Sequence, residues 1–474
     1  MYKNLSRRQF IQSAALLAAG GTLAACAPSP TTPDQPDVAD VVEEVRTEAP
    51  KEVTVRTRVE FYGGPGGVEG WEDVFHEEHP DLEYFEILRI EGLASQEQFL
   101  SLVAAGTPPD CARLESSFYR TFCHYGLLLS ISENINADPE FSQPDYWIQP
   151  QETDRCEYQG EWYGIGSCWV APHFYYDQEL FDELGVAPPS NDPDDAWSWE
   201  EFVQIARQLT VDSNGNHPGE SGFDINNVVR WGVNWPTWWI PLHAAVQSND
   251  SPWVDTETDT IALDRARAME ALQRISDLQH VHQVMPKADA MEALGMGGAQ
   301  LLETHRVALI VDGSWALNWL WEIEGTLGTG VLPKMIRPAT DMQAHLVSIV
   351  KGTTQPENAW RLVRFLSSPW FQEGNLASGL WLPSQTALMT DEAISRWCRP
   401  PVHPEGYELI VREYTPEYGH YLTMPVGYIK AVDTAVQPAF DKLFFGEARA
   451  EEVMPGAVAE ANAIMQTELA RPSM

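Results

Sequence analysis

The stretch VALIVDGSW, residues 307–315, contains five consecutive apolar side chains followed by Asp312, Gly313, Ser314 and Trp315. A short, unbroken apolar run predicts a strand that is buried on both faces. The polar residue, the glycine and the tryptophan then fall at the carboxyl end of that strand, where open α/β sheets place their ligands. We therefore expect Asp312 and Trp315 to lie at a binding site.

Strands and helices alternate in the preceding part of the chain. Apolar and charged residues alternate over 53–61, which predicts a strand, and a second strand is expected at 80–87. Helices are expected at 71–79 and 95–105, and a third strand begins at Cys111. This order is typical of an α/β fold with a parallel sheet.

Three later segments have apolar residues at helical spacing. The first follows Asp264, which we expect to cap the helix, and the other two cover 358–366 and 454–469. We expect the apolar faces of these helices to lie in the core.

The composition argues against nucleic acid as a partner. The 474 residues include 30 Lys and Arg against 69 Asp and Glu, which gives a formal net charge of −39. Such a chain is repelled by phosphate backbones and by anionic membrane surfaces. Its 18 Trp, 17 Phe and 15 Tyr indicate recognition surfaces, and its length suggests two or three domains.

The first 51 residues are typical of an exported, anchored protein. Residues 1–25 contain the basic start SRRQFI and an apolar run that is too short to span a bilayer, which predicts a twin-arginine signal peptide. Cys26 directly follows Leu-Ala-Ala and resembles the lipidated cysteine of a bacterial lipobox. Residues 26–51 are rich in proline and acids and predict a flexible tether. We therefore expect an extracytoplasmic protein that Cys26 anchors to the cell membrane through lipid.

The five other cysteines allow disulfides without fixing them. Cys111 and Cys123 are twelve residues apart, as are Cys156 and Cys168. Two short-loop bridges are therefore possible, and Cys398 would remain a thiol.

Three apparent motifs lack the spacing that their chemistry needs. The histidines of HEEH at 76–79 are three apart instead of four, so they do not form a metalloprotease helix. The turn GGPGG at 63–67 has no following Gly-Lys-Ser/Thr, and no Gly-x-Ser-x-Gly occurs. We expect no metal ion, no cofactor and no catalytic residue.

An ordered set of landmarks resembles a known family. The landmarks are GTPPD at 106–110, GEWYGI at 160–165, FYYDQELFDELGV at 174–186, WSWEEF at 197–202, the stretch 307–315, VLP at 331–333, NAW at 358–360, FLSS at 365–368 and LP at 382–383. Together they are similar to the extracellular solute-binding proteins of ABC importers, of the large sugar-binding type, over nearly all of 52–470. The chain departs from the family pattern at WWIPLHAAV, 238–246, where paired glycines are often found.

The resemblance implies two hinged α/β lobes of a periplasmic-binding-protein fold, with the ligand in the cleft between them. Matched landmarks place the interlobe crossings near Gly166, Asp312 and Ser368. One lobe would then comprise 52–166 with 313–367, and the other 167–312 with 368–474. The implied partners are a small solute and the permease subunits of an ABC transporter.

A sugar presents C–H faces and hydroxyl edges, so its site needs aromatic platforms and polar side chains. Three indoles within 235–239, flanked by prolines, cannot all enter one core, so at least one is expected to face ligand. Trp162, Trp199 and Trp360 are assigned to the core. The candidate ligand-binding residues lie at strand ends and in loops, and they are Phe61, Tyr62, Glu115, Ser117, Trp169, Trp235, Trp238, Trp239, Asp312, Trp315 and Trp381.

Two other kinds of function stay open beside a binding protein that delivers an oligosaccharide or similar polyol. A surface-tethered glycoside hydrolase would need two carboxyl groups about 5–10 Å apart. No landmark brings two carboxylates together, although 69 acidic residues do not exclude such a pair. A binder of a polyamine, a glycerol phosphate or a peptide would fit the same fold. We favour the carbohydrate-binding protein.

Overall fold

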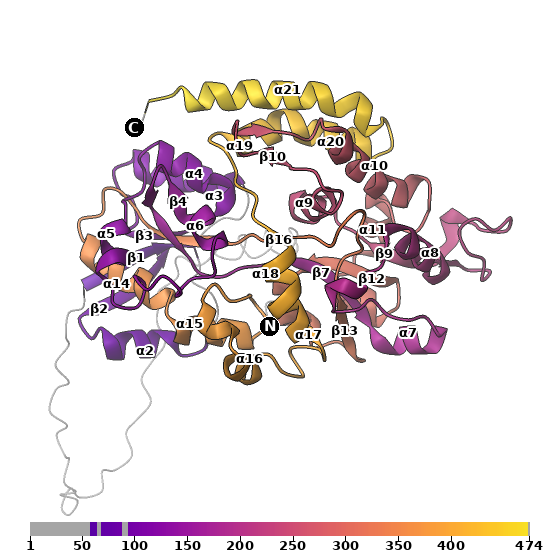
Figure 1. Ribbon diagram of the computed structural model, residues 1–474, viewed down its shortest axis with the longest axis horizontal. Coiled ribbons are helices and arrows are strands. Elements are labelled where there is room, and N and C mark those ends of the chain that lie inside the picture. Colours follow the sequence, from indigo (N-terminus) through magenta and orange to yellow (C-terminus); the bar gives the residue numbers. More distant parts are fainter. Residues whose placement is uncertain (1–56, 64–67, 88–92, 473–474) are drawn as a thin grey trace, which may run out of the picture. The chain divides into compact units, whose positions relative to one another are not determined.

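The computed structural model describes residues 57–63, 68–87 and 93–472, so the predicted signal peptide, Cys26 and tether lie outside the described residues. Two five-stranded sheets form its framework (Figure 1). The first has the strand order β2-β1-β3-β15-β6, and the second has the order β13-β7-β12-β9-β8.

The first sheet begins with the predicted alternation of strands and helices. Strands β1, β2 and β3 pair in parallel, whereas β15 is antiparallel to both β3 and β6. The sheet is therefore mixed, because two strands from distant parts of the chain complete a parallel core. Its elements are β1 (Thr57–Tyr62), α2 (Trp71–Glu78), β2 (Leu82–Ile87), α3 (Leu93–Ala104), β3 (Cys111–Glu115), α4 (Ser116–His124), β6 (Gly164–Gly166), β15 (His345–Ile349) and α14 (Pro356–Leu366).

The second sheet is centred on the strand predicted from residues 307–315. Strand β12 pairs in parallel with β9 and antiparallel with β7, so it has neighbours on both sides. Val307 to Val311 are at most 3% exposed, which explains the unbroken apolar run. The elements of this sheet are β7 (Pro172–Asp177), α7 (Gln178–Leu184), α8 (Trp199–Leu209), β8 (Val211–Asp212), β9 (Val228–Asn234), α9 (Trp239–Ser248), α10 (Ala266–His280), β12 (Val307–Gly313) and β13 (Leu327–Gly330).

Shorter strands and further helices complete the described part of the chain. They are α5 (Ser132–Ala137), α6 (Gln151–Cys156), β4 (Glu157–Tyr158), β5 (Glu161–Trp162), β10 (Val254–Asp255), β11 (Thr260–Ile261), α11 (Ala288–Leu294), α12 (Gly298–Glu303), α13 (Leu317–Leu320), β14 (Thr340–Asp341), α15 (Pro369–Ala377), α16 (Asp391–Trp397), α17 (Tyr407–Leu409), α18 (Thr415–Tyr418), β16 (Gly419–His420), α19 (Tyr428–Ala431), α20 (Gln437–Phe444) and α21 (Ala450–Leu469).

The three helices predicted from apolar spacing are present, but their starts differ from the predictions: α14 begins two residues earlier, α21 four residues earlier and α10 one residue later. In α10 the apolar residues from Ala268 to Leu278 lie in the core, as expected. The helix begins one residue later than predicted, because Arg265 occupies the N-cap position and no side chain caps it. Asp264 is therefore not the cap.

The chain passes from the first sheet to the second between Gly166 and Pro172. In this passage Val170 pairs with Gln343, and Trp169 pairs with Leu382. The backbone hydrogen bonds of these two pairs are 2.7 to 3.1 Å long. Three extended segments thus run side by side where the sheets meet. Such hydrogen-bonded segments restrict how two rigid bodies can rotate about one another.

Two of the predicted crossing points differ from the structure. Residues 313–367 were expected to lie in one lobe, but β13 pairs with β7 in the second sheet and only β15 belongs to the first. After Ser368, Phe371 of α15 still packs against Trp71 of α2, with ring centroids 5.9 Å apart. The change of sheet therefore lies after Gly330 instead of near Asp312, and α15 stays with the first sheet.

The cysteines of the described residues are all thiols, so neither possible short-loop bridge forms. Burial raises the pKa of Cys168 to about 11 and the pKa of Cys123 to about 12. Because the thiolate is the reactive form, these side chains behave as small apolar core residues.

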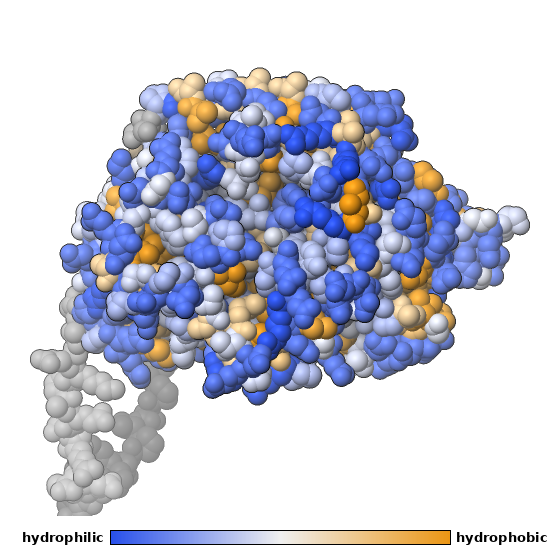
Figure 2. Space-filling model, in the orientation of Figure 1, coloured by the Kyte–Doolittle hydropathy of each residue, from blue (hydrophilic) through white to orange (hydrophobic). Residues whose placement is uncertain are grey.

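The surface drawn in Figure 2 is mainly hydrophilic, with apolar residues in small scattered patches. This fits the strongly acidic composition. No helix in the part of the chain that the structure describes has both the length and the apolar character to cross a membrane.

Candidate functional site

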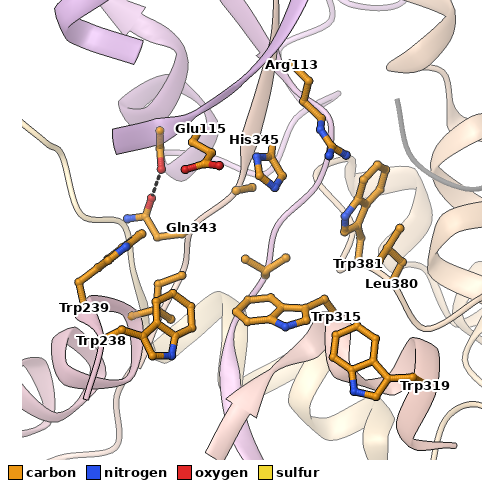
Figure 3. A pocket seen from close by; sticks show the side chains of 14 residues that line it. Arg113, Glu115, Trp238, Trp239, Trp315, Trp319, Gln343, His345, Leu380 and Trp381 are labelled. Carbon is orange, nitrogen blue, oxygen red and sulfur yellow. Dashed lines mark hydrogen bonds between the residues drawn. The ribbon is translucent and has the colours of Figure 1, made fainter. Parts of the chain in front are cut away.

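A cavity of about 650 Å³ is lined by β3 and β15 of the first sheet, by the start of α4 and of α9, by the turn and helix that follow β12, and by segments between the sheets. Figure 3 shows tryptophans along one side of it and polar side chains on the opposite side. Its lining residues are Arg113, Glu115, Ser116, Val170, Trp238, Trp239, Ile240, Trp315, Trp319, Gln343, Ala344, His345, Leu380 and Trp381.

The tryptophan-rich loop divides its three indoles between the core and the cavity. Trp235 is 1% exposed and packs edge-to-face against Phe174 and Trp199, which anchors the loop in the second core. Trp238 then occupies the N-cap position of α9 and is 40% exposed, and Trp239 begins the helix. The rings of Trp238 and Trp239 are perpendicular, with centroids 6.1 Å apart.

Trp315 is placed by the turn that ends β12. Its ring lies against Gly313, where an added Cβ would overlap the indole, so a glycine is required at this position. The ring centroid of Trp315 is 5.9 Å from that of Trp238. Trp319 follows one helical turn later in α13 and is 44% exposed. Together with Trp239, these side chains form a row of four indoles, which we call the indole wall.

The polar side of the cavity comes from β3 and β15. Arg113 and Glu115 are two residues apart on β3, so they project from the same face of the sheet. His345 lies directly opposite Glu115 in the antiparallel pairing. In Figure 3 the Arg113 guanidinium points towards the Trp381 ring, with His345 between Arg113 and Glu115. We call Arg113, Glu115 and His345 the polar wall.

The floor between the two walls contains Gln343, which is 2% exposed. The hydroxyl of Ser116 donates to Oε1 of Gln343 over 2.6 Å, drawn as a dashed line in Figure 3. The Gln343 amide donates to the backbone carbonyl of Leu422. Gln343 is therefore fixed by partners on two other segments.

Five of the predicted site residues line this cavity: Glu115, Trp238, Trp239, Trp315 and Trp381. These five residues come from four separate segments of the chain. Trp381 is only 5% exposed, so a small part of a largely buried side chain reaches the cavity.

The other predicted residues do not line the cavity. Phe61 and Trp169 are fully buried, and Tyr62, Ser117 and Trp235 are 1% to 6% exposed. Trp169 lies within the passage between the sheets, and the Arg155 guanidinium is 3.7 Å from its ring centroid. Because these side chains are buried, their role in ligand binding stays a prediction.

Asp312 is half-buried at the end of β12 and is not among the lining residues. Burial raises the pKa of its carboxyl group to about 6, although the backbone N–H of Gly313 donates to it and opposes the rise. Asp312 therefore helps to shape the turn before Trp315.

Sequence reasoning missed Arg113, Ser116, Trp319, Gln343 and His345. Two of them could have been predicted from the sequence, because Arg113 shares a strand face with Glu115 and Trp319 lies four residues after Trp315. Gln343 and His345 had no comparable signal, since only pairing with distant segments brings them to the cavity.

The lining combines flat apolar rings with hydrogen-bonding groups, which suits a ligand that has apolar faces and polar edges. The ionisable lining residues within the described ranges are Arg113, Glu115 and His345. Across those ranges, no cluster of three or more His, Cys, Asp or Glu side chains is arranged to hold a metal ion.

Comparison with known protein families identifies the family of this chain. Residues 70–373 match the model of the bacterial extracellular solute-binding proteins, which is more than half of the chain. The protein belongs to this family. The family's description implies an extracytoplasmic location, and the solved structures below show that the fold is that of the two-lobed solute-binding proteins.

Similar solved structures cover most of this solute-binding protein. An ABC substrate-binding protein of Listeria monocytogenes, in complex with cycloalternan, matches 87% of this chain and 99% of its own, with a TM-score of 0.74 and 18% identity. The GacH receptor of Streptomyces glaucescens, solved unliganded and with acarbose, matches 88% of this chain and 100% of its own, with a TM-score of 0.67 and 16% identity.

One curated relative shows similarity over a shorter region. The arabinooligosaccharide-binding protein of Halalkalibacterium halodurans is 24% identical over 188 residues, which cover 39% of this chain. The match spans only 36% of that relative's length.

Proposed function

We propose that this protein is a membrane-tethered lipoprotein that captures an oligosaccharide or similar polyol outside the cytoplasm and delivers it to the permease of an ABC transporter. The observation that carries the proposal is the single cavity in which the indole wall faces the polar wall. Stacked indoles bind the C–H faces of sugar rings, and arginine, glutamate and glutamine bind their hydroxyls.

The size and composition of the cavity support a ligand of several rings. The indoles of Trp239, Trp238 and Trp315 follow one another at centroid separations of 6.1 and 5.9 Å. A cavity of about 650 Å³ is within the range of sites that enclose most of a small ligand. Two of the structural relatives are described with cycloalternan and with acarbose, and the curated relative is named for arabinooligosaccharides.

A thermal-shift screen tests the proposal directly. Purified mature protein is mixed with arabino- and maltooligosaccharides, polyols, glycerol phosphates, polyamines and peptides. A ligand that binds the folded state raises the melting temperature in proportion to the logarithm of its concentration. We expect oligosaccharides to give the largest shift, and a larger shift with polyamines or peptides would replace the proposed solute class.

The same oligosaccharides separate binding from hydrolysis. A solute-binding protein leaves them intact, whereas a glycoside hydrolase produces new reducing ends. Prolonged incubation followed by a reducing-end assay should therefore show no increase, and sustained turnover would overturn the binding function.

The anchor is tested at Cys26. Lipoproteins carry two or more acyl chains, which hold a protein stably at a bilayer. The mature protein should enter the detergent phase with an acylated N-terminus, and Cys26→Ser should release it into the aqueous phase. An unmodified mature N-terminus in mass spectrometry would contradict the lipid anchor.

A further inference from the structure

A row of buried polar side chains, ending at the half-buried Gln247, runs beneath the cavity and connects its two sides. We call it the floor chain, and it consists of Gln247, His243, Asp341, Gln343 and Ser116. Three separate elements contribute to it: α9, the segment that contains β14, and the start of α4.

The part of the floor chain in α9 is built around His243, which is fully buried. Its Nδ1 is hydrogen-bonded to Oδ1 of Asp341, and its Nε2 is 3.0 Å from the side-chain nitrogen of Gln247. An amide nitrogen can only donate, so Nε2 accepts and the ring proton lies on Nδ1, from which it is donated to Asp341. Burial lowers the pKa of His243 to about 3, so the imidazole is neutral.

Asp341 passes the connection on to the cavity floor. It is 0% exposed, burial raises its pKa well above the usual range, and it lies two residues before Gln343 in the same segment. Gln343 in turn accepts the hydroxyl hydrogen bond of Ser116, the first residue of α4. Ser116 directly follows Glu115 of the polar wall.

The helical geometry of α9 connects His243 to the indole wall. Trp239 and His243 are four residues apart in the same helix, so they lie on the same helical face. A helix turn held by two hydrogen bonds at His243 also holds the turn that carries Trp239. The opposite end of the floor chain holds Gln343 and Ser116, which line the cavity themselves.

We infer that the floor chain positions the indole wall against the polar wall, and that His243 and Asp341 are positioning residues for ligand binding although neither lines the cavity. This inference rests on the proposed function of the cavity. Hydrogen bonds between buried polar side chains hold them in one arrangement. Removing His243 would leave the Gln247 amide and Asp341 Oδ1 without these partners, beside the Asp341 Oδ2 atom, which is buried without a hydrogen-bond partner. The orientation of Trp239 is therefore set by groups that do not contact the ligand.

Two substitutions at one position test the inference. His243→Ala removes both hydrogen bonds, whereas His243→Asn keeps a polar group near the place of Nδ1 and preserves the bond to Asp341. The control is Ser276→Ala in α10. This substitution removes a buried hydrogen bond of 2.9 Å from the Ser276 hydroxyl to the Leu443 carbonyl, and neither residue lines the cavity. Unfolding in urea establishes how strongly each variant is destabilised.

Hydrogen exchange of α9 is the readout that needs no ligand. His243→Ala should speed amide exchange in residues 239–248 by about tenfold or more, as expected when buried hydrogen bonds are lost, and His243→Asn should restore most of the protection. Ser276→Ala should leave exchange in α9 unchanged. Equal exchange in α9 for His243→Ala and the native protein, or equal acceleration by Ser276→Ala, would overturn the inference.

Calorimetric titration with arabinotriose and with maltotriose gives the second readout. For either sugar that the native protein binds, His243→Ala should weaken affinity by about tenfold and His243→Asn by no more than about threefold. Native affinity in His243→Ala would show that the floor chain is only structural. If the native protein binds neither sugar, the proposed oligosaccharide binding is contradicted for these two sugars. Hydrogen exchange in α9 still decides whether the floor chain positions the indole wall.

Discussion

Trp315 shows how one small residue places a large one. Because its indole rests on Gly313, the Trp315 ring lies with its centroid 5.9 Å from that of Trp238. Trp381 approaches the cavity from a different segment and is held by backbone pairing between Leu382 and Trp169. The two rings are therefore fixed independently, and their contributions to affinity can be measured separately.

Trp315→Ala and Trp381→Ala should each weaken oligosaccharide binding by about 1–3 kcal/mol, the value of one buried aromatic platform. This corresponds to about 5- to 150-fold in affinity, measured by calorimetry on the folded variants. Trp360→Phe is the control, because Trp360 packs against Phe141 outside the cavity and should change stability but not affinity. Native affinity in both alanine variants would contradict the assignment of the cavity as the ligand site.

Asp312 should make stability depend on pH. The pKa of its carboxyl group is about 6 in the folded protein against 3.8 in the unfolded chain. Ionisation of Asp312 therefore lowers the free energy of unfolding as the pH rises from 3.8 to 6; the loss is complete above pH 6 and absent below pH 3.8. Asp312→Asn should thus be more stable than the native protein by about 1–3 kcal/mol at pH 8, with the difference falling to nearly zero at pH 4. Urea unfolding across this range measures it, and a difference that does not vary with pH would refute the explanation.

At the scale of elements, the passage from β6 to β7 depends on a buried ion pair. Arg155 donates to Glu152 and to the carbonyl of Cys168, and Glu152 also accepts from the backbone N–H of Gly166. A buried pair of this kind contributes geometry more than net stability, but losing one partner is costly. The passage is consequently held near its beginning, at Gly166 and Cys168.

Gly166→Ala should disrupt this arrangement. A Cβ at residue 166 would overlap the Arg155 guanidinium and the Glu152 carboxylate, so the variant should lose about 3–5 kcal/mol of stability in urea unfolding. Gly456→Ala is a matched control within α21, where an added methyl meets nothing within 4 Å and should stabilise the helix by about 0.5–1 kcal/mol. Equal effects of the two substitutions would rule out this role of the ion pair.

The elements differ in how far sequence could predict them. Strand β12 was predictable because both of its faces are buried, so all five residues of its apolar run are needed. Strand β13, whose sequence is Leu-Gly-Thr-Gly, has two glycines and no alternation, and only its pairing with β7 makes it a strand. The crossing predicted near Asp312 failed for this reason.

The same limit applies to the cavity. Exposed indoles beside prolines indicated a recognition surface, but the burial of Trp235 depends on Phe174 and Trp199, which are distant in sequence. His345 reaches the polar wall only because β15 pairs with β3 at a particular register. Local patterns therefore predict the type of site, and tertiary pairing determines which residues line the cavity.

At the scale of the whole molecule, the three extended segments between the sheets are suited to a closing motion. If closure buries the ligand, small-angle scattering should give a smaller radius of gyration with saturating oligosaccharide than without it. Binding is confirmed independently by calorimetry on the same sample. An unchanged radius in the bound sample would argue against a hinged two-lobe cleft.

The close spacing of the indoles has an optical consequence. Transition dipoles of chromophores about 6 Å apart couple, so Trp239, Trp238 and Trp315, with centroid separations of 6.1 and 5.9 Å, should give an exciton couplet in circular dichroism. The sign and amplitude of a couplet depend on the angles between the rings, which a stacked guest alters. The protein thus carries an intrinsic chiroptical reporter, and an unlabelled library of solutes can be titrated against it.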